Sequence, residues 1–222
     1  MSIALPDRRW PAWWELPARR VVDLTLAVLA LLLLALPMLA LALAIRLDSP
    51  GPALFRQRRI GLGGRPFTMY KFRTMRAGAG AGAGDEALRD LIARELRGED
   101  TSSEGSTKLA RDPRLTRLGR FLRRTSLDEL PQLINVVQGH MALVGPRPCL
   151  DWEAEMFPGA FAQRFAVRPG LTGLWQVGGR STMGTLEMLR LDVVYVRGWG
   201  FWRDLKILAL TLPTLLRGDG AR

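Results

Sequence analysis

RRTSLDELPQLINVVQGHMALVGPRP, residues 123–148, is the stretch around which the rest of the chain is best understood. Its apolar residues recur at helical spacing and Gly139 follows the last of them, which predicts a helix that ends at this glycine. Asp128 and Glu129 fall at the start of that helix. The positive end of the helix dipole there keeps carboxylates ionised and attracts phosphate. The stretch therefore predicts an anion site at a helix start.

A simpler interpretation of the same residues is a capping box, in which Ser126 opens the helix and Glu129 reaches back to a free backbone N–H. Pro131 argues against it, because with Ser126 as the cap the proline would fall at the fifth helical position and remove a hydrogen bond. A helix that starts at Leu127 or Asp128 leaves Pro131 among residues whose N–H groups are free in any case. In that arrangement Glu129 is available for another role.

The composition excludes a disordered protein and indicates an anionic partner. Of the 222 residues 48% are hydrophobic, seven are tryptophan, and the formal charge is +11. This suits a globular or membrane-associated protein whose partner is nucleic acid, anionic lipid or a phosphorylated substrate. The single cysteine, Cys149, excludes an internal disulfide, and with the single histidine, His140, it makes no zinc ligand set. A reducing, cytoplasm-facing setting fits this usage.

The N-terminal part carries membrane signals. Residues 1–20 combine arginines with Trp10, Trp13 and Trp14, which is the pattern of an interfacial anchor. A run without charge follows at 24–45, about 33 Å long as a straight helix and so able to cross a bilayer. A cleaved signal peptide fits poorly, because the leader before the run is long and rich in tryptophan.

The run can be placed as a single-pass anchor or as a bent helix. Its short flanks are basic on both sides, and the positive-inside rule then places both ends in the cytoplasm. Pro37 lies past the middle of the run and interrupts the backbone hydrogen bonds. We therefore expect residues 21–47 to form a re-entrant, proline-broken membrane helix of a monotopic protein. Residues 48–222 then form a domain on the cytoplasmic side.

The domain is predicted to be α+β and mostly helical, with a small β-hairpin. Strands at 53–60 and 66–72 flank a glycine turn. These glycines are not a nucleotide-binding loop, because no Rossmann or P-loop pattern stands in the right context. Lys71 and Arg73 leave the hairpin on one face, where they are available for phosphate or are simply solvated charges.

Three further segments have recognisable character. Residues 77–107 read as a linker and variable insertion, with an Ala-Gly repeat and a short amphipathic helix at 85–97. Arginines recur on one face of residues 114–124, which indicates lipid headgroups or a phosphate site, a solvated helix face being the alternative. Residues 201–216 are too interrupted by charges to span a membrane and are expected to lie on it as an interfacial helix.

Five motifs in order make the chain resemble a known family. They are KFRTM (71–75), DPR (112–114), SLDELPQ (126–132), VGPRP (144–148) and RPGLTGLWQV (168–177). From Arg19 to about Thr214 the chain is similar to the bacterial polyprenyl-phosphate hexose-1-phosphate transferases, the monotopic phosphoglycosyl transferases. The resemblance implies the same re-entrant helix. Two positions depart from the pattern: Leu36 precedes Pro37 where relatives often carry serine, and Val194 stands where an aromatic residue is common.

The resemblance also implies a reaction. Asp128 attacks the sugar-bearing phosphate of a UDP-sugar and releases UMP, Asp128 and Glu129 hold Mg²⁺, and a polyprenyl phosphate then attacks the aspartyl intermediate. The product is a polyprenyl-diphosphate sugar. Substrate-binding residues implied by the matching motifs are Lys71, Arg73, Arg147, Pro148, Arg168, Gln176, Arg180 and Asp192.

A carboxylate that attacks a phosphate needs compensating positive charge nearby. A carboxylate is able to attack phosphorus as a nucleophile. At about 4 Å from one phosphate charge, however, it meets roughly 4 kcal/mol of repulsion at an effective dielectric of 20. Mg²⁺ together with Arg147, Arg168 and Arg180 supplies compensating charge.

The expected partners are a UDP-sugar, polyprenyl phosphate in the membrane and anionic phospholipid, with no nucleic acid. The expected location is the inner membrane, with the catalytic domain facing the cytoplasm, where the reaction begins a polysaccharide or glycoconjugate. The residues leave the sugar and the oligomeric state open. Two rivals remain: a membrane-tethered basic protein that binds anionic lipid or nucleic acid, and a metal-dependent lipid-phosphate phosphatase that uses water as acceptor.

Overall fold

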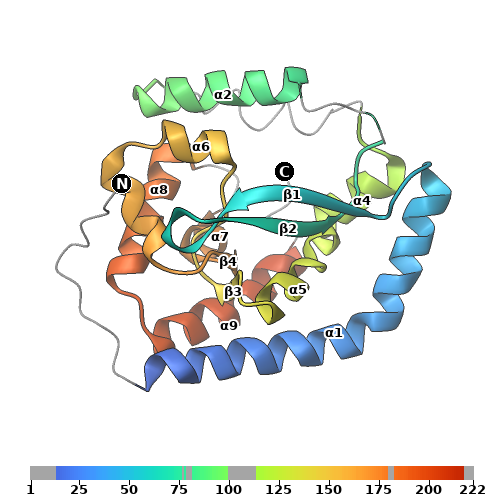
Figure 1. The fold of residues 1–222 in the computed structure, drawn as a ribbon, viewed down its shortest axis with the longest axis horizontal. Coiled ribbons are helices and arrows are strands. Elements are labelled where there is room, and N and C mark those ends of the chain that lie inside the picture. Colours follow the sequence, from blue (N-terminus) through green and yellow to red (C-terminus); the bar gives the residue numbers. More distant parts are fainter. Residues whose placement is uncertain (1–13, 77, 79–81, 100–113, 180–182, 218–222) are drawn as a thin grey trace.

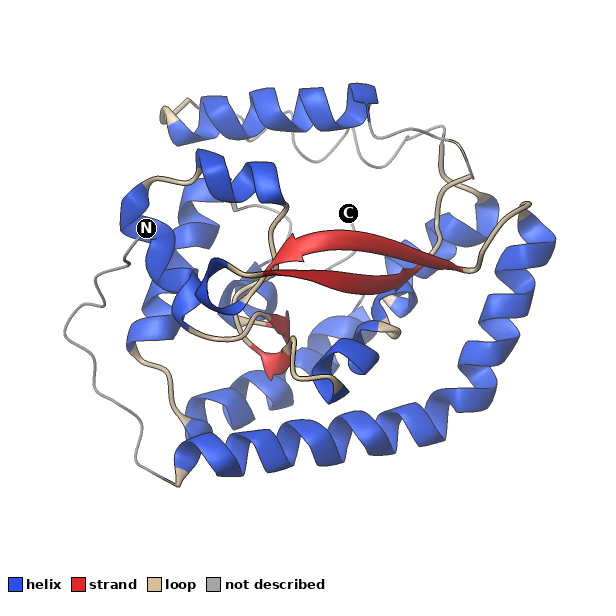
Figure 2. Ribbon diagram, in the orientation of Figure 1, coloured by secondary structure: helices blue, strands red, loops and turns tan. Residues whose placement is uncertain are grey.

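The computed structural model describes residues 14–76, 78, 82–99, 114–179 and 183–217 (Figure 1). Trp10, Trp13 and Arg180 therefore lie outside the described residues. The described part is mostly helical and contains the predicted small antiparallel sheet (Figure 2). Its α-helices are α1 (Glu15–Asp48), α2 (Gly82–Leu96), α4 (Arg117–Thr125), α5 (Gln132–Val137), α6 (Asp151–Met156), α7 (Leu174–Gly179), α8 (Thr185–Arg197) and α9 (Phe201–Arg217). The 3-10 helices are η1 (Leu62–Gly64), η2 (Leu127–Glu129) and η3 (Gly159–Ala166).

The predicted hairpin is confirmed. Strands β1 (Leu54–Ile60) and β2 (Pro66–Phe72) pair antiparallel around η1, with Phe55 opposite Lys71 and Arg59 opposite Phe67. Since directly paired residues share a face and the side-chain period is two, Arg59 and Lys71 lie on the same face of the hairpin. That face turns toward the site described below.

A second sheet was not predicted. Strands β3 (Ala142–Val144) and β4 (Gly170–Thr172) pair in parallel and bring the VGPRP and RPGLTG motifs side by side. Glycines permit the close approach, because a Cβ on Gly145 would stand 2.4 Å from the Arg168 carbonyl oxygen and one on Gly170 would stand 2.0 Å from the Gly145 nitrogen. No local periodicity signals such short strands, which sit near the middle of the body in Figure 1.

The main core lies between β2, α5, β3, α8 and α9. Its buried members include Met69, Leu133, Val136, Val144 and Tyr195. Burial of such side chains contributes about 1.5–3 kcal/mol each. A smaller cluster joins the far end of α1 to the hairpin and α4 and consists of Ile45, Phe72 and Leu122. The two clusters hold α5 and η2 in a fixed place relative to the hairpin.

Asn135 joins α5 to β2. Its side chain is fully buried, its Oδ1 accepts the Tyr70 N–H at 3.0 Å, and its Nδ2 donates to the Thr68 carbonyl at 2.7 Å. The amide thus satisfies the edge of β2 as a neighbouring strand would. This bond pair fixes the position of Lys71, the next residue of β2, relative to the helix that follows the two acidic residues.

Helix α1 has 34 residues and a proline inside, Pro37. It runs beneath the body and then turns sharply upward beside α4 (Figure 1). A helix-interior proline removes a hydrogen bond and is the ordinary cause of such a bend. The helix is long and apolar enough to cross a membrane. Its most apolar 18-residue stretch has a mean hydropathy of 2.9, and only 6% of that stretch is buried in the protein. Its exposed side chains, Leu33 at 80% and Leu36 at 79% among them, form a large uncovered apolar surface.

Polar contacts fasten both ends of α1 to the same domain. Near its start, Arg20 donates to the Val136 carbonyl at 2.7 Å, and Asp23 accepts the Leu143 N–H at 3.0 Å. Arg19 is buried close by, where it pairs with Asp204 of α9. At the other end, Arg73 donates to the last carbonyls of α1, at 2.6 Å to that of Ser49. Both ends of the apolar run therefore lie against one body.

The remaining predicted helices are present. The helix expected at 85–97 is α2, which docks on the body: the Thr185 N–H donates to Glu95 Oε2 at 2.8 Å, and the Arg89 guanidinium lies 5.0 Å from the ring centre of Trp152. The segment expected at 201–216 is α9, whose Trp202 is 72% exposed. The arginine-rich segment becomes α4, with Thr116 as its cap.

The role of Asn135 yields a stability prediction. Asn135→Leu keeps about the same side-chain volume but leaves the partly buried Tyr70 N–H and Thr68 C=O without the Asn135 amide, and each lost hydrogen bond costs about 1 kcal/mol or more. We expect the free energy of unfolding in detergent to fall by about 2 kcal/mol or more. Gln138→Leu, at an exposed amide at the end of the same helix, is the control. Equal stability of the two variants would contradict the bridging role.

Candidate active site

The acidic pair lies in the tight connection between α4 and α5. Ser126 closes α4 in the left-handed region, with a φ of 56°, and the 3-10 helix η2 follows at once. A positive φ is uncommon outside glycine, and such backbone tends to occur at functional sites. The chain folds back here because Leu127 and Leu130 pack on the small core cluster. Asp128 and Glu129, between these leucines, are carried by that turn.

The capping-box interpretation is wrong. The Ser126 side chain makes no capping hydrogen bond, and Pro131 occupies the N-cap position of α5. The start of the helix differs from the prediction too. Asp128 and Glu129 lie in η2 ahead of α5, which has only six residues. Because so short a helix has little macrodipole, attraction for anions here rests on side-chain cations.

Two cations meet at Glu129. Lys71 Nζ lies 3.0 Å from Glu129 Oε1, and Arg147 Nη1 lies 3.4 Å from the same oxygen. Lys71 comes from the end of β2, Glu129 from η2 and Arg147 from the turn after β3. Three segments far apart in the sequence therefore build one charged centre. Glu129 is available for this role because it caps no helix.

Burial dominates the electrostatics of Asp128. Its side chain is only 8% exposed. Desolvation raises the pKa of Asp128, and the neighbouring Glu129 charge adds to the rise, while the positive charges of Lys71, Arg123 and Arg147 oppose it. Among the described residues, hydrogen bonds reach Glu129 but not the Asp128 carboxylate. Asp128 is thus a poorly solvated carboxylate beside several cations, which is the setting of a reactive nucleophile.

Burial also acts on Lys71. Desolvation lowers the pKa of Lys71, and the charges of Glu129 and Asp128 counteract that fall. The side chains of Lys71 and Glu129 are 16% and 21% exposed, so their pairing is only weakly screened by solvent. The acidic pair and Lys71 therefore stabilise each other's charged forms.

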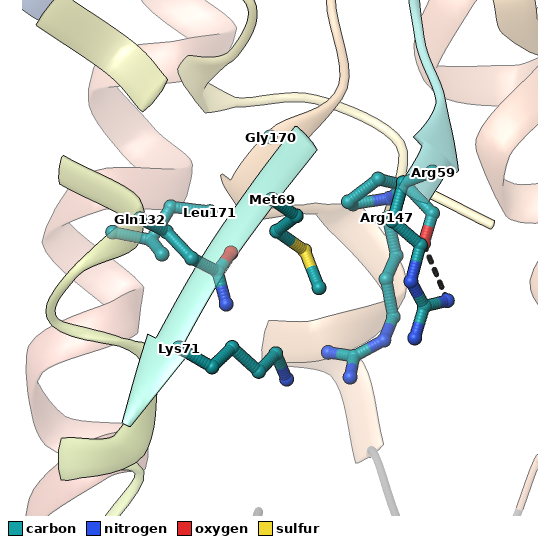
Figure 3. A pocket seen from close by; sticks show the side chains of 8 residues that line it. Arg59, Met69, Lys71, Gln132, Arg147, Gly170 and Leu171 are labelled. Atoms are coloured by element: carbon teal, nitrogen blue, oxygen red, sulfur yellow. Dashed lines mark hydrogen bonds between the residues drawn. The ribbon is translucent and has the colours of Figure 1, made fainter. Parts of the chain in front are cut away.

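A solvent-open pocket, whose empty volume of about 210 Å³ includes space open to solvent, is lined by Lys71 and Arg147, the two cations that contact Glu129. Figure 3 shows Lys71 and Arg147 pointing toward one another across it, with Gln132 on the α5 side. The lining residues are Arg59, Met69, Lys71, Gln132, Arg147, Pro148, Gly170 and Leu171. Its arginine and lysine side chains suit it to bind phosphate groups.

Several predicted site residues lie elsewhere. Arg73 is buried and caps the end of α1, so its guanidinium does not face the pocket. Arg168 is exposed, donates to the Gly139 carbonyl at 2.9 Å and is not among the residues that line the pocket. Gln176 is buried in α7 and donates to the Leu171 carbonyl. Asp192 is buried in α8 and pairs with Arg164. Pro148 does line the pocket.

Sequence reasoning missed three residues near the site. Gln132 lines the pocket and is the last residue of the SLDELPQ motif, which could have drawn attention to it. Arg59 lines it too and shares the hairpin face of Lys71, which strand alternation could have shown. Arg164 donates to the Arg147 carbonyl at 2.7 Å from η3. Nothing local in the sequence points to that long-range contact.

Comparison with known proteins identifies the family of the chain. Residues 14–218 match the model of the family described as bacterial sugar transferase. The chain is 41% identical over 222 residues to the galactosyl transferase CpsE of Streptococcus agalactiae, covering 100% of this chain and 47% of that protein. It is 45% identical over 212 residues to the UDP-glucose:undecaprenyl-phosphate glucose-1-phosphate transferase of Caulobacter vibrioides, covering 91% and 71%. It is 37% identical over 206 residues to the exopolysaccharide production protein ExoY of Rhizobium meliloti, covering 92% and 88%. The chain thus spans about half the length of the first of these relatives.

Proposed function

The chain belongs to the bacterial sugar transferase family, and from this premise we propose that it transfers a sugar-1-phosphate from a UDP-sugar to a polyprenyl phosphate in the membrane. The product is a polyprenyl-diphosphate sugar, which begins a polysaccharide or glycoconjugate. The names of the relatives support the reaction class, since one is a UDP-glucose:undecaprenyl-phosphate glucose-1-phosphate transferase. The observation that carries the proposal is the buried Asp128 carboxylate next to Glu129, Lys71 and Arg147.

The proposed chemistry has two half-reactions. An Asp128 oxygen forms a bond to the sugar-bearing phosphorus of the UDP-sugar while the bond from that phosphorus to UMP breaks. A phosphate oxygen of the polyprenyl phosphate then bonds to the same phosphorus, and Asp128 leaves as a free carboxylate. Poor solvation of Asp128 favours the first attack, because little water has to be removed from the nucleophile.

Nearby cations offset the repulsion between the Asp128 carboxylate and the phosphates of the donor. Lys71 and Arg147 point into the pocket beside the pair, where they can bind the two phosphates of the donor (Figure 3). An arginine suits this task because its planar fork bonds phosphate oxygens in pairs. Gln132 adds an uncharged donor to the lining of the pocket.

Mg²⁺ fits the same centre. The described residues hold no group of three or more His, Cys, Asp or Glu side chains, which speaks against a cage made by protein alone. Mg²⁺ is usually held by one or two carboxylates together with substrate phosphates and water, and Asp128 and Glu129 provide such carboxylates. When bound, the ion neutralises charge on the phosphates.

We propose further that α1 is re-entrant and that the domain faces the cytoplasm at the inner membrane. Both ends of its apolar run bind the same body, through Arg20 and Asp23 at one end and Arg73 at the other. A straight crossing would carry those ends to opposite sides of the bilayer. The basic face of α4 and Trp202 of α9 then meet anionic phospholipid headgroups.

Transfer of radiolabel from a panel of UDP-sugars into membrane lipid tests the function. We expect one or more sugars to be transferred in the presence of Mg²⁺. Asp128→Asn should reduce the rate at least about a thousandfold, because an amide is a very poor nucleophile. Glu129→Gln should raise the Mg²⁺ concentration needed by at least about tenfold.

Matched controls exist on α6. Asp151→Asn removes a carboxylate from a surface ion pair with Arg58, and Glu155→Gln changes an exposed carboxylate, so both should transfer at the wild-type rate. Free sugar phosphate released without lipid product would indicate the phosphatase. No turnover of any UDP-sugar, with binding of anionic vesicles retained, would indicate the binding protein.

Cysteine labelling tests the re-entrant helix. Single cysteines in place of Ser2, before α1, and Thr68, on the exposed side of the hairpin, should both resist a membrane-impermeant thiol reagent in intact cells and react after permeabilisation. Native Cys149 is buried and should stay silent. Proline costs a helix interior about 3 kcal/mol, so Pro37→Leu favours a straight helix that crosses the bilayer. One of the two reporters should then lie outside the cell and react with the reagent. Labelling of the wild-type Ser2 reporter from outside would contradict the proposal.

A further inference from the structure

Two arginines, Arg164 and Arg59, donate hydrogen bonds to the turn that carries Arg147. Arg164 Nη2 donates to the Arg147 carbonyl at 2.7 Å, and Arg59 Nη1 donates to the Pro148 carbonyl at 3.2 Å. The dashed line in Figure 3 marks the second of these bonds. The two carbonyls belong to consecutive residues, and the first of these, Arg147, projects its guanidinium toward Glu129.

Arg164 is held rigidly from η3. Its Nε and Nη2 both donate to Asp192 Oδ2, at 3.0 and 2.7 Å, and the two side chains are only 6% and 4% exposed. The rings of Phe157 and Phe165 lie 5.1 and 5.5 Å from the guanidinium carbon. A buried ion pair adds little stability compared with well-packed apolar residues. Its distinctive effect here is to aim one N–H at the Arg147 carbonyl.

Arg59 is held from the other side. Its side chain is 13% exposed, its Nη1 lies 3.5 Å from Glu153 Oε2, and its Nε and Nη2 donate to Gln57 Oε1. Burial lowers the pKa of Arg59 to about 10, which leaves it charged at neutral pH. Glu153 also accepts the Leu150 N–H at 2.6 Å and so ties the chain just beyond the turn to α6.

We propose that Arg164 and Arg59, each oriented by its own carboxylate, are positioning residues that brace the turn and thereby set the place of the Arg147 guanidinium. For its effect on turnover this inference rests on the proposed function. Arginine is needed at position 164 because one planar fork reaches both Asp192 and the Arg147 carbonyl. A lysine keeps the charge but cannot hold both partners in that geometry.

A double-mutant cycle tests the brace against a merely structural role. Arg164→Lys should lower kcat/KM for sugar-phosphate transfer by about tenfold or more in the wild-type background. In an Arg147→Ala background the same change should cost less than about twofold, because the group that it positions is gone. Arg197→Lys is the control, since Arg197 donates to Gln163 of η3 from an exposed site. An equal loss in both backgrounds would overturn the proposal.

Amide hydrogen exchange provides a readout that does not depend on turnover. In Arg164→Lys the peptide covering residues 141–150 should exchange faster than in wild type, with no such change in Arg197→Lys. Unchanged exchange there would overturn the brace even if transfer fell. If exchange is faster in Arg164→Lys but the wild-type protein transfers sugar phosphate from no UDP-sugar, the brace is supported and the proposed function fails.

Two further variants guard against misfolding of Arg164→Lys. Asp192→Asn keeps the shape of the partner but removes the charge that orients Arg164, and Arg59→Lys weakens the second bond to the turn. Both should show the same dependence on Arg147 and the same local rise in exchange. If the folded variants lose activity equally with and without Arg147, the positioning role is refuted.

Discussion

The buried Asp128 carboxylate and the half-buried Glu129 carboxylate beside it need nearby cations, and the fold is arranged to supply them. At about 4 Å, two like charges repel by roughly 4 kcal/mol at an effective dielectric of 20. Lys71 and Arg147 approach Glu129 to 3.0 and 3.4 Å and offset this repulsion. The hairpin, the turn after β3 and the connection between α4 and α5 are each placed by separate contacts, and each contributes one member of the charged centre.

The same elements connect the charged centre to the apolar helix. Arg20 binds the end of α5, Asp23 binds β3, and Arg73, just beyond the hairpin, binds the end of α1. Asn135 in turn fixes β2 to α5. The height of the acidic pair above α1 is therefore set by direct bonds. In the proposed reaction the acceptor headgroup is confined to the membrane surface, so that this height decides whether the headgroup reaches Asp128.

The sequence predicted the features that have a local signal. Alternating residues and a glycine turn identified the hairpin, Pro37 and the apolar run identified the bent helix, and motif order identified the acidic pair. The parallel pairing of β3 with β4 has no such signal, because two three-residue strands far apart in the chain meet through glycines. Arg73 was assigned to phosphate from its place beside Lys71 at the end of the hairpin and from the family motif, and Asp192 was assigned to substrate from the motif alone. The structure engages Arg73 with the carbonyls of α1 and Asp192 with Arg164, partners that only the tertiary fold brings near.

The most direct test of the account is the state of Asp128 after incubation with Mg²⁺ and an accepted UDP-sugar in the absence of any lipid acceptor. If the buried carboxylate is the nucleophile, up to one UMP per enzyme is released, and the peptide that contains Asp128 gains the mass of one sugar phosphate. UMP that appears only when polyprenyl phosphate is present, with no adduct on that peptide, would contradict the account and indicate direct transfer between donor and lipid.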